Sequence, residues 1–274
     1  MTRPLALSFV LAAGCYPAMQ HFTSPAVPVS GHADVHIVAD DASVHVTAAD
    51  VAQVAMQIDS RGYDPGDLET SMTPHGNRVD VVVKVHRRWQ LLDATIRGLH
   101  IDVIVPRDSD VVIHTSDGSV TTDAIAGNLD VETHDGSVTV HEAHGQIRLH
   151  TGDGSIHAEG LDGFVDAMTG DGSVALDGRF DALVVKTSDG SLRATARPGS
   201  RMLQPWRLHT GDGSVHLDLP RDLAAHLDAS TGDGSLHSEF PLYRRGGSSI
   251  GELNGGGPPI VVHTDDGSIH LAQI

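Results

Sequence analysis

Eight aspartates recur in one pentapeptide, Thr-x-Asp-Gly-Ser, and they are the first residues whose spacing could support chemistry. Carboxylates aligned a few ångströms apart repel one another, and calcium, which takes oxygen ligands, could relieve that repulsion. The sequence lacks the Gly-Gly-x-Gly-x-Asp loop of nonapeptide calcium rolls, so the alternative is that each Asp hydrogen-bonds its own turn, assisted by the Ser hydroxyl. The candidate calcium ligands are Asp117, Asp135, Asp153, Asp171 and Asp189.

Histidines form a second candidate site, two residues after the Ser of the pentapeptide. They are His216, His237 and His270, with His157 at the same position of an earlier copy. If consecutive repeats stack, His216 and His237 become lateral neighbours whose imidazoles could bind a transition metal. The alternative is a set of exposed strand histidines that bind nothing.

A third candidate site lies where the repeat is interrupted. The segment 193–207 concentrates four arginines and a tryptophan in an otherwise acidic chain, and the segment 240–247 again combines an aromatic residue with arginines. Arginine could supply charge and an aromatic ring stacking for an anionic glycan or a protein partner. The alternative is that both are ordinary insertions packed on the flank of the fold. The candidate ligand-binding residues are Arg197, Arg201, Trp206, Arg207, Tyr243, Arg244 and Arg245.

No catalytic residue is assigned. The serines recur identically, without a unique Ser beside a base, and a residue repeated in every copy is expected to be structural. The leading expectation is therefore a protein that is not an enzyme. Acidic clusters on the parallel sheets of polysaccharide-cleaving β-helices keep a glycan-acting enzyme as the alternative, and a calcium-stabilised scaffold is a further one.

Each pentapeptide lies between two short stretches of alternating apolar residues. Val111 and Ile113 precede the first copy, and Val120 follows it. This period of two predicts one strand that ends at the Thr and one that starts after the Ser. Asp-Gly forms the corner between them, with Gly expected to supply a positive φ. A second corner is expected at Gly127 and its equivalents Gly145 and Gly163.

The repeat period distinguishes two folds. The copies begin at Thr115, Thr133, Thr151, Thr169, Thr187, Thr210, Thr231 and Thr264, so the first five are 18 residues apart. An all-β fold follows, either a parallel two-sheet β-solenoid with coils of about 18 residues or an antiparallel β-meander. In the solenoid, Asp130, Arg148 and Asp166 become lateral neighbours of alternating charge, whereas the meander places Asp166 opposite Asp177. The sequence therefore favours the solenoid.

The N-terminal residues carry an export signal. Arg3 precedes a short apolar stretch, and Cys15, the only cysteine, follows Ala12-Ala13-Gly14 as in a bacterial lipobox. Lipidation of Cys15 would anchor an exported protein in the cell envelope, with the outer membrane as the expected location. The alternative is ordinary cleavage that leaves a free thiol. The expected organisation is a lipoprotein signal peptide (1–14), a Pro-rich tether (15–31), an irregular β cap region (32–110) and the repeat solenoid (111–274).

The composition limits the classes of partner and the residue types that can form the core. The net charge of −18 excludes a nucleic-acid binder, because such a protein needs a basic surface to displace counterions. No run of apolar residues is long enough to cross a bilayer as a helix. With 39% hydrophobic but only 4% aromatic residues, the chain is expected to have a thin aliphatic core and no required cofactor.

A family resemblance rests on three features in order: a strand that ends in Ile104-Val-Pro-Arg-Asp-Ser-Asp110, the Asp-Gly-Ser repeats, and Gly255-Gly-Gly-Pro-Pro-Ile-Val-Val-His-Thr-Asp-Asp-Gly-Ser-Ile269 at the end. Over residues 30–274 the chain resembles the bacterial putative-adhesin β-strand-repeat family, a domain of unknown function. The resemblance implies an envelope-associated β-repeat domain and transfers no catalytic residues. Together these features predict a non-enzymatic envelope lipoprotein that presents a rigid β-repeat scaffold for adhesion or for binding a protein or glycan.

Overall fold

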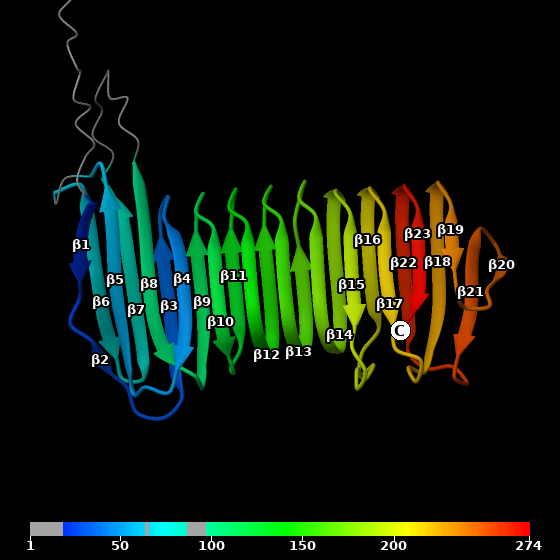
Figure 1. The fold of residues 1–274 in the computed structure, drawn as a ribbon, viewed down its shortest axis with the longest axis horizontal. Coiled ribbons are helices and arrows are strands. Elements are labelled where there is room, and N and C mark those ends of the chain that lie inside the picture. The colour runs from blue at the N-terminus through cyan, green and yellow to red at the C-terminus, as the bar shows by residue number, and fades with distance from the viewer. Residues whose placement is uncertain (1–18, 64–65, 87–96) are drawn as a thin grey trace, which may run out of the picture.

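The computed structural model describes residues 19–63, 66–86 and 97–274, which form an elongated stack of β-strands (Figure 1). Equivalent strands of successive repeats pair in parallel, with Leu129 opposite Ile147 and Val138 opposite Ile156. Each of these pairs joins residues 18 positions apart, so one repeat makes one coil. The expectation of an all-β, solenoid-like fold is confirmed. The antiparallel meander is wrong for the repeats, since it would pair consecutive strands within one repeat.

The strands that end at the pentapeptide Thr form one continuous ladder with the strands paired beside them at both ends. It is here called the Thr ladder. In spatial order it contains β6 (Leu68–His75), β7 (Arg78–Val85), β3 (Ala33–Ala39), β9 (Ser109–Thr115), β11 (Leu129–Thr133), the second halves of β12 (Val138–Thr151), β13 (Ile156–Met168) and β14 (Val174–Asp189), β16 (Trp206–Asp212), β22 (Pro259–Asp266), β18 (Ala225–Asp233), β21 (Ser248–Leu253) and β20 (Tyr243–Arg245).

The strands that start after the pentapeptide Ser form the second ladder with the N-terminal strands paired beside them. It is here called the Ser ladder. It contains β1 (Met19–Thr23) and β2 (Val27–Pro28), which both pair with β5 (Gln53–Arg61), and then β8 (Gly98–Pro106), β4 (Ser43–Ala49), β10 (Val120–Ile125), the first halves of β12, β13 and β14, β15 (Leu192–Ala196), β17 (Val215–Leu219), β23 (Ile269–Gln273) and β19 (Leu236–Ser238).

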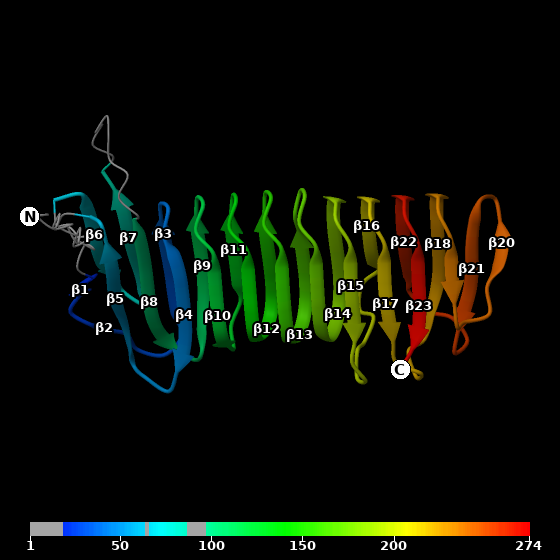
Figure 2. The same ribbon diagram turned by 45° about the horizontal axis from the view of Figure 1, so that its top comes forward.

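The order of the coils in the stack departs from their order in the sequence at two places. The C-terminal strands β22 and β23 are inserted between β16/β17 and β18/β19, as Figure 2 shows. Near the N-terminus, β3 and β4 likewise lie between β7/β8 and β9/β10. Two coils, β22/β23 and β3/β4, therefore lie at positions in the stack that differ from their positions in the sequence.

Antiparallel strands close both ends of the stack. At one end β5 and β6 pair antiparallel to β8 and β7, and at the other end β21 pairs antiparallel to β18, with β20 outside it. An open parallel edge would recruit other chains, and β20 blunts it by being short and by carrying two arginines. The C-terminal strand β23 therefore does not form this end of the stack, and β21 and β20 cover β18 instead.

The N-terminal boundaries differ from those expected. Residues 19–23 and 27–28, assigned to the tether, are the strands β1 and β2, and they pair with β5. The expected cap region contains two true coils, β3/β4 and β7/β8, because their strands pair in parallel with the repeats or with each other. The antiparallel strands alone therefore form the cap. Among the described residues, no helix has the length and apolarity needed to cross a bilayer.

The core is a thin column of small aliphatic side chains between the ladders, as the composition predicts. Alternate positions of every coil are buried, including Val131, Val140 and Leu149. The fully buried large rings lie beside the first interruption of the repeat, and Phe240 is buried at the second. At the first interruption, Phe180 and Trp206 pack edge to face with 5.9 Å between ring centroids.

The pentapeptide turns the chain and also joins each coil to the next. The Thr169 hydroxyl donates a hydrogen bond to the carbonyl oxygen of Gly154 in the preceding coil (2.7 Å), and Thr151 does the same to Gly136 (2.8 Å). The equivalent bond recurs at Thr133, Thr187, Thr210, Thr264 and Thr231.

Close approach of the coils, and not a left-handed backbone, explains the motif glycine. Of the eight motif glycines only Gly267 has a positive φ (+158°), so the expected positive φ is wrong for the others. A Cβ on Gly154 would instead lie 2.1 Å from the carbonyl oxygen of Gly136, and one on Gly172 would lie 2.1 Å from that of Gly154. The corner therefore requires glycine because the neighbouring backbone occupies the space of a side chain.

Candidate functional site

A groove of about 610 Å³ runs along the outer face of the Thr ladder. Its lining comes from six adjacent strands, β3, β9, β11, β12, β13 and β14, and from Gln204 in the loop before β16. Adjacent strands lie about 4.8 Å apart, so the groove is about 24 Å long. This length fits an extended polymer better than a compact small molecule.

The first row of the groove combines carboxylates and amides. The Asp110 carboxylate accepts a hydrogen bond from the backbone N–H of Asn128 (2.7 Å), and the Asn128 side-chain oxygen accepts one from the backbone N–H of Gln146 (3.1 Å). These bonds fix the two side chains by their oxygens. The Asn128 side chain also interacts with the Asp110 carboxylate. The Gln146 side chain makes no hydrogen bond within the described part of the chain, so its amide remains as a donor and acceptor for a ligand.

Asp110 carries a charge at the start of this row. Burial raises the pKa of Asp110, but the hydrogen bonds from the Asn128 backbone and from His32 outweigh it, so the pKa lies below its usual value. The carboxylate is therefore ionised at neutral pH.

The second row has the alternating charge predicted from the sequence. Arg148 stands between Asp130 and Asp166 in register, and its guanidinium donates to the Asp130 carboxylate (2.8 Å). Within the described residues, the Asp166 Oδ1 atom is buried and has no hydrogen-bond partner, and His150 Nε2 lies 3.8 Å away, beyond hydrogen-bond reach.

Charge and shape restrict what the groove can bind. Four carboxylates (Asp34, Asp110, Asp130 and Asp166) line it against one guanidinium, and the half-buried ring of Phe164 lies beside Gln146 in register. An anionic polymer would be repelled. A neutral, hydroxyl-rich chain could donate to the carboxylates, bond the amides and stack on the ring.

Sequence reasoning placed Asp130, Arg148 and Asp166 side by side, but it did not select the other residues of the groove. They occupy outward positions of the strands, where Asp110, Asn128, Gln146 and Phe164 differ from one repeat to the next while the pentapeptide stays constant. That variation was the available signal.

The arginine-rich segment 193–207 proves to be fixed to the stack. Arg197 forms an ion pair with Asp177, and the Arg201 Nε atom lies 3.5 Å from the Asp181 carboxylate. The backbone N–H of Arg201 also donates to the Phe180 carbonyl oxygen (3.0 Å). These contacts support the alternative of an insertion packed on the flank.

Trp206 is a core residue, which makes its expected role in ligand stacking wrong. Its side chain is fully buried against Phe180, and its ring N–H has no hydrogen-bond partner among the residues that the structure describes. Arg207 is the neighbouring outward residue on β16 and is exposed, in register with Val184 and Val261. The two members of this pair therefore face opposite sides of the Thr ladder.

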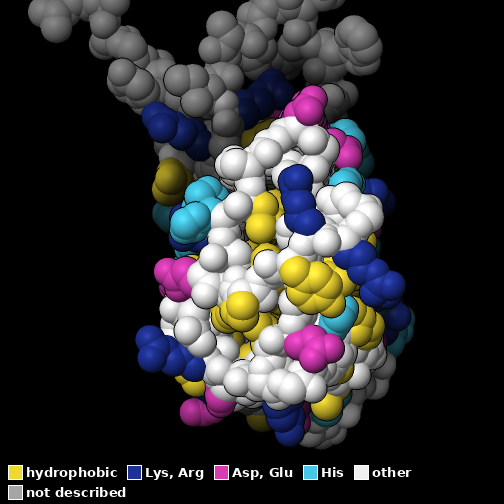
Figure 3. Space-filling model, turned by 90° about the vertical axis from the view of Figure 1, so that its right-hand side faces the viewer, with side chains coloured by type: hydrophobic (Ala, Val, Ile, Leu, Met, Phe, Trp, Pro, Cys, Tyr) yellow, Lys and Arg dark blue, Asp and Glu magenta, His cyan; other side chains and the backbone are white. Residues whose placement is uncertain are grey.

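The second interruption lies at the far end of the stack. Tyr243, Arg244 and Arg245 form β20 and are exposed, with 57% of Tyr243 accessible. Figure 3 views this end and shows hydrophobic side chains among scattered basic and acidic ones. Because β22, β18 and β21 separate β16 from β20, the two arginine-containing segments do not form one site.

The histidine column has a different order from the one expected. His270 lies between His216 and His237, because β23 is inserted between β17 and β19. The His216 and His270 rings stack with centroids 4.5 Å apart, whereas His237 and His270 are 5.9 Å apart and tilted. Burial, followed by the charges of Arg193 and His270, lowers the pKa of His216. The lowered pKa favours the neutral form of His216.

The motif aspartates form an exposed column along one edge of the stack. Asp189 is in register with Asp212, which is in register with Asp266, and Asp266 with Asp233. None of the eight belongs to a group of three side chains close enough to share a metal ion within the described residues. Calcium binding by Asp117, Asp135, Asp153, Asp171 and Asp189 therefore remains a prediction. Cys15, the expected lipidation site, lies outside the described residues.

Solved structures similar to the chain come from bacteria. A putative adhesin from Bacteroides fragilis is 10% identical, with a TM-score of 0.48 over 95% of this chain and 100% of its own. A putative lipid binding protein from Parabacteroides distasonis is 12% identical, with a TM-score of 0.48 over 95% and 98%. A putative cell adhesion protein from Clostridium sporogenes is 9% identical, with a TM-score of 0.34 over 94% and 100%.

No curated protein matches the chain. The family model named Toastrack DUF4097 matches residues 32–272, which include the repeats and both antiparallel ends. The resemblance to a bacterial β-repeat family of unknown function is thereby confirmed, and the chain belongs to the Toastrack DUF4097 family.

Proposed function

We propose that this protein is a non-enzymatic cell-envelope scaffold whose two ladders act as the two sheets of a rigid solenoid and whose groove binds an extended neutral glycan for adhesion. The observation that carries the proposal is the groove along the Thr ladder, where amides, carboxylates and one aromatic ring follow one another over six strands. Its polar groups recur at the strand spacing, so several units of one polymer can make similar contacts.

The charge of the groove selects the glycan. The sequence suggested an anionic ligand on the arginines of the interruptions, but Arg197 and Arg201 already pair with Asp177 and Asp181. The groove itself carries an excess of carboxylates. A neutral polyhydroxylated chain avoids repulsion and offers hydroxyl donors to the carboxylates that line the groove.

A scaffold needs no catalytic group, and rigid strands favour binding. Side chains on strands are held in fixed positions by the buried residues that alternate with them, which lowers the entropy cost of binding. The glycan-cleaving alternative predicts new chain ends during incubation, so one binding experiment can test both functions.

The decisive experiment measures binding of residues 19–274 to neutral, anionic and cationic polysaccharides by affinity electrophoresis. The double variant Gln146→Ala/Phe164→Ala is expected to lower affinity for a neutral polysaccharide at least about tenfold, since a lost aromatic contact and a lost hydrogen bond together exceed about 1.4 kcal/mol. The matched control is Tyr243→Ala/Arg244→Ala at the end of the stack, which should bind as the unaltered protein does.

Three outcomes would contradict the proposal. Loss of binding in the Tyr243/Arg244 variant with retention in the groove variant would place the site at the end of the stack. Preference for the anionic polysaccharide would contradict the charge argument. Release of reducing ends by the unaltered protein would favour the enzyme.

We further propose that Cys15 carries the lipid that anchors the scaffold to the outer membrane. The support is the position of this only cysteine after a short apolar stretch and Ala12-Ala13-Gly14. The mass of the mature N-terminal peptide tests the anchor, and an unmodified Cys15 or cleavage elsewhere would refute it.

A further inference from the structure

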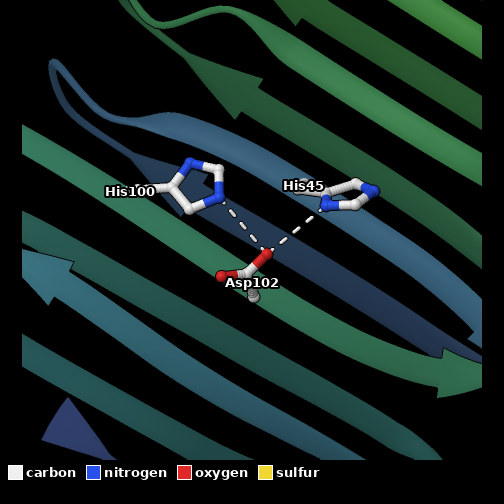
Figure 4. Close-up of side chains that lie close together, drawn as sticks. All are labelled: His45, His100 and Asp102. Carbon is white, nitrogen blue, oxygen red and sulfur yellow. Dashed lines mark ion pairs between the residues drawn. The ribbon is translucent and has the colours of Figure 1, made fainter. Parts of the chain in front are cut away.

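Three metal-binding side chains meet on the outer face of the Ser ladder, away from the groove. His45 lies on β4, and His100 and Asp102 lie on β8 (Figure 4). The two strands pair in parallel, with His45 directly opposite Asp102 and His100 two residues before Asp102 on the same face. The three side chains therefore converge because of strand register.

The backbone under this cluster is held rigidly. On β4 the residues on either side of His45, Val44 and Val46, are buried, and on β8 Ile101 and Val103 are buried in the same way. Alternating burial leaves the polar side chains outward and fixes the positions of their Cα atoms. The cluster remains accessible, with 34–46% of each side chain exposed.

The two distances to Asp102 match those of a tetrahedral metal site. The Asp102 Oδ1 atom lies 3.3 Å from His45 Nδ1 and 3.3 Å from His100 Nε2, and the ligand atoms of all three residues lie within 4.8 Å of one another. Zinc bonds of about 2.0–2.1 Å at tetrahedral angles separate neighbouring ligand atoms by about 3.3–3.4 Å. We propose that His45, His100 and Asp102 bind a divalent transition-metal ion, zinc by preference, with water completing the coordination.

A fourth residue holds His45 in the orientation that such a site needs. The His45 Nε2 atom lies 2.6 Å from the Asp123 carboxylate on β10. A metal-binding histidine typically donates its other ring N–H to a carboxylate in this manner, which fixes the tautomer and the ring. Asp123 is therefore a positioning residue, and Nδ1 is left free to face Asp102.

The donor set also selects the class of metal. Two imidazole nitrogens and one carboxylate oxygen suit zinc, copper or nickel, whereas calcium and magnesium take oxygen ligands. A bound ion would join β4, which belongs to an inserted coil, to β8 next to the antiparallel cap. The metal would therefore stabilise the N-terminal end of the stack.

Calorimetric titration with zinc chloride tests the site. The chelator-treated protein (residues 19–274) is expected to take up one equivalent at its tightest site. His100→Gln and His45→Gln should each weaken that site at least about 100-fold. Asp123→Asn should weaken it about 10–100-fold, because the positioning contact is lost. Calcium and magnesium should give no saturable binding at this site.

A matched control uses the stacked histidines at the other end of the molecule. His216→Gln/His270→Gln removes a comparable pair of exposed-face imidazoles and should leave the tightest zinc equivalent unchanged. Melting curves with chelator verify that every variant is folded, and zinc should raise the melting temperature of the unaltered protein but not of His100→Gln. Cobalt(II) should give the intense visible absorption of a tetrahedral ion, reduced in the His45 and His100 variants.

Two results would overturn the proposal. One is an unchanged tightest equivalent in both folded variants, His45→Gln and His100→Gln. The other is loss of that equivalent in the His216/His270 control, which would place the metal in the histidine column.

Discussion

The corner edge of the solenoid and the outer faces of its ladders arise from the same repeats but use their residues differently. At the edge, the pentapeptide recurs eight times, and its Thr and Gly contact the backbone of the preceding coil. On the faces, equivalent positions carry different side chains, such as Asn128, Gln146 and Phe164 in consecutive coils. The residues that stack one coil on the next are the same in each copy. The residues of the groove and of the His45 cluster differ from coil to coil.

The difference has a physical cause. Every coil must place its corner at the same distance from the next. The same Thr and Gly contacts with the neighbouring backbone therefore recur in all eight copies. An outward side chain meets solvent and two lateral neighbours, which leaves its identity free. Substitutions should therefore reduce stability strongly at the corner and weakly on the faces.

Gly154→Ala should give the largest effect. The added Cβ would lie 2.1 Å from the Gly136 carbonyl oxygen, and two backbones would have to separate. We expect a loss of about 3 kcal/mol in the free energy of unfolding, measured by urea denaturation followed by circular dichroism.

Gly98→Ala is the matched control for this change. A Cβ at Gly98, at the start of β8, would meet nothing within 4 Å, so the same substitution should be neutral or slightly stabilising. Equal losses at both positions would show that close approach does not explain the motif glycine.

Thr169→Val should have an intermediate effect. The Thr169 hydroxyl donates to the Gly154 carbonyl oxygen (2.7 Å) and accepts from the Gly172 backbone N–H (3.3 Å), and valine keeps the shape while leaving both groups unpaired. We expect a loss of about 1–2 kcal/mol in the same assay. Asp153→Asn, in the exposed column beside Gly154, should change stability by less than about 0.5 kcal/mol. A larger loss for Asp153→Asn than for Thr169→Val would reverse the assignment of structural roles in the pentapeptide.

Much of the edge could be predicted from the sequence, because its period is local. Intervals of 18 residues predicted the parallel register, in which Thr133 pairs with Thr151. On the outer face, the same register predicted that Asp130, Arg148 and Asp166 are lateral neighbours. The reason for the glycine could not be predicted, since a nearby carbonyl from another coil leaves no mark in the sequence. Nor could the insertion of β22 and β23 before β18, because a chain that returns into its own stack keeps the same period.

The faces were harder to predict for a related reason. His45 and His100 are 55 residues apart and meet because β4 pairs with β8, a register that no spacing in the sequence reveals. Trp206 was assigned to a ligand because it stands beside arginines, yet strand alternation places it inward and Arg207 outward. The composition of the segment therefore identified an unusual region of the chain. The alternation along β16 determined which of its side chains face solvent.

The smallest expected effect is a change of stability with pH. It has opposite signs for two histidines, His216 and His32. The pKa of His216 is lowered by burial first, then by Arg193 and His270, with Asp218 opposing, so its protonation is less favourable in the folded than in the unfolded protein. Its contribution to stability is therefore lost as pH falls below the usual histidine value. His216→Gln should then become relatively more stable between pH 7.5 and pH 5.5, by no more than about 0.5 kcal/mol.

His32 at the opposite end gives the matched comparison. Its hydrogen bonds with Asp108 (2.9 Å) and Asp110 (3.1 Å) raise its pKa, so it stabilises the fold fully below the unfolded value and loses that contribution as pH rises through the folded one. His32→Gln should therefore become relatively less stable over the same fall in pH. Melting curves with chelator at both pH values measure the two trends, and changes of the same sign would show that the partners of a face histidine do not determine its response to acid.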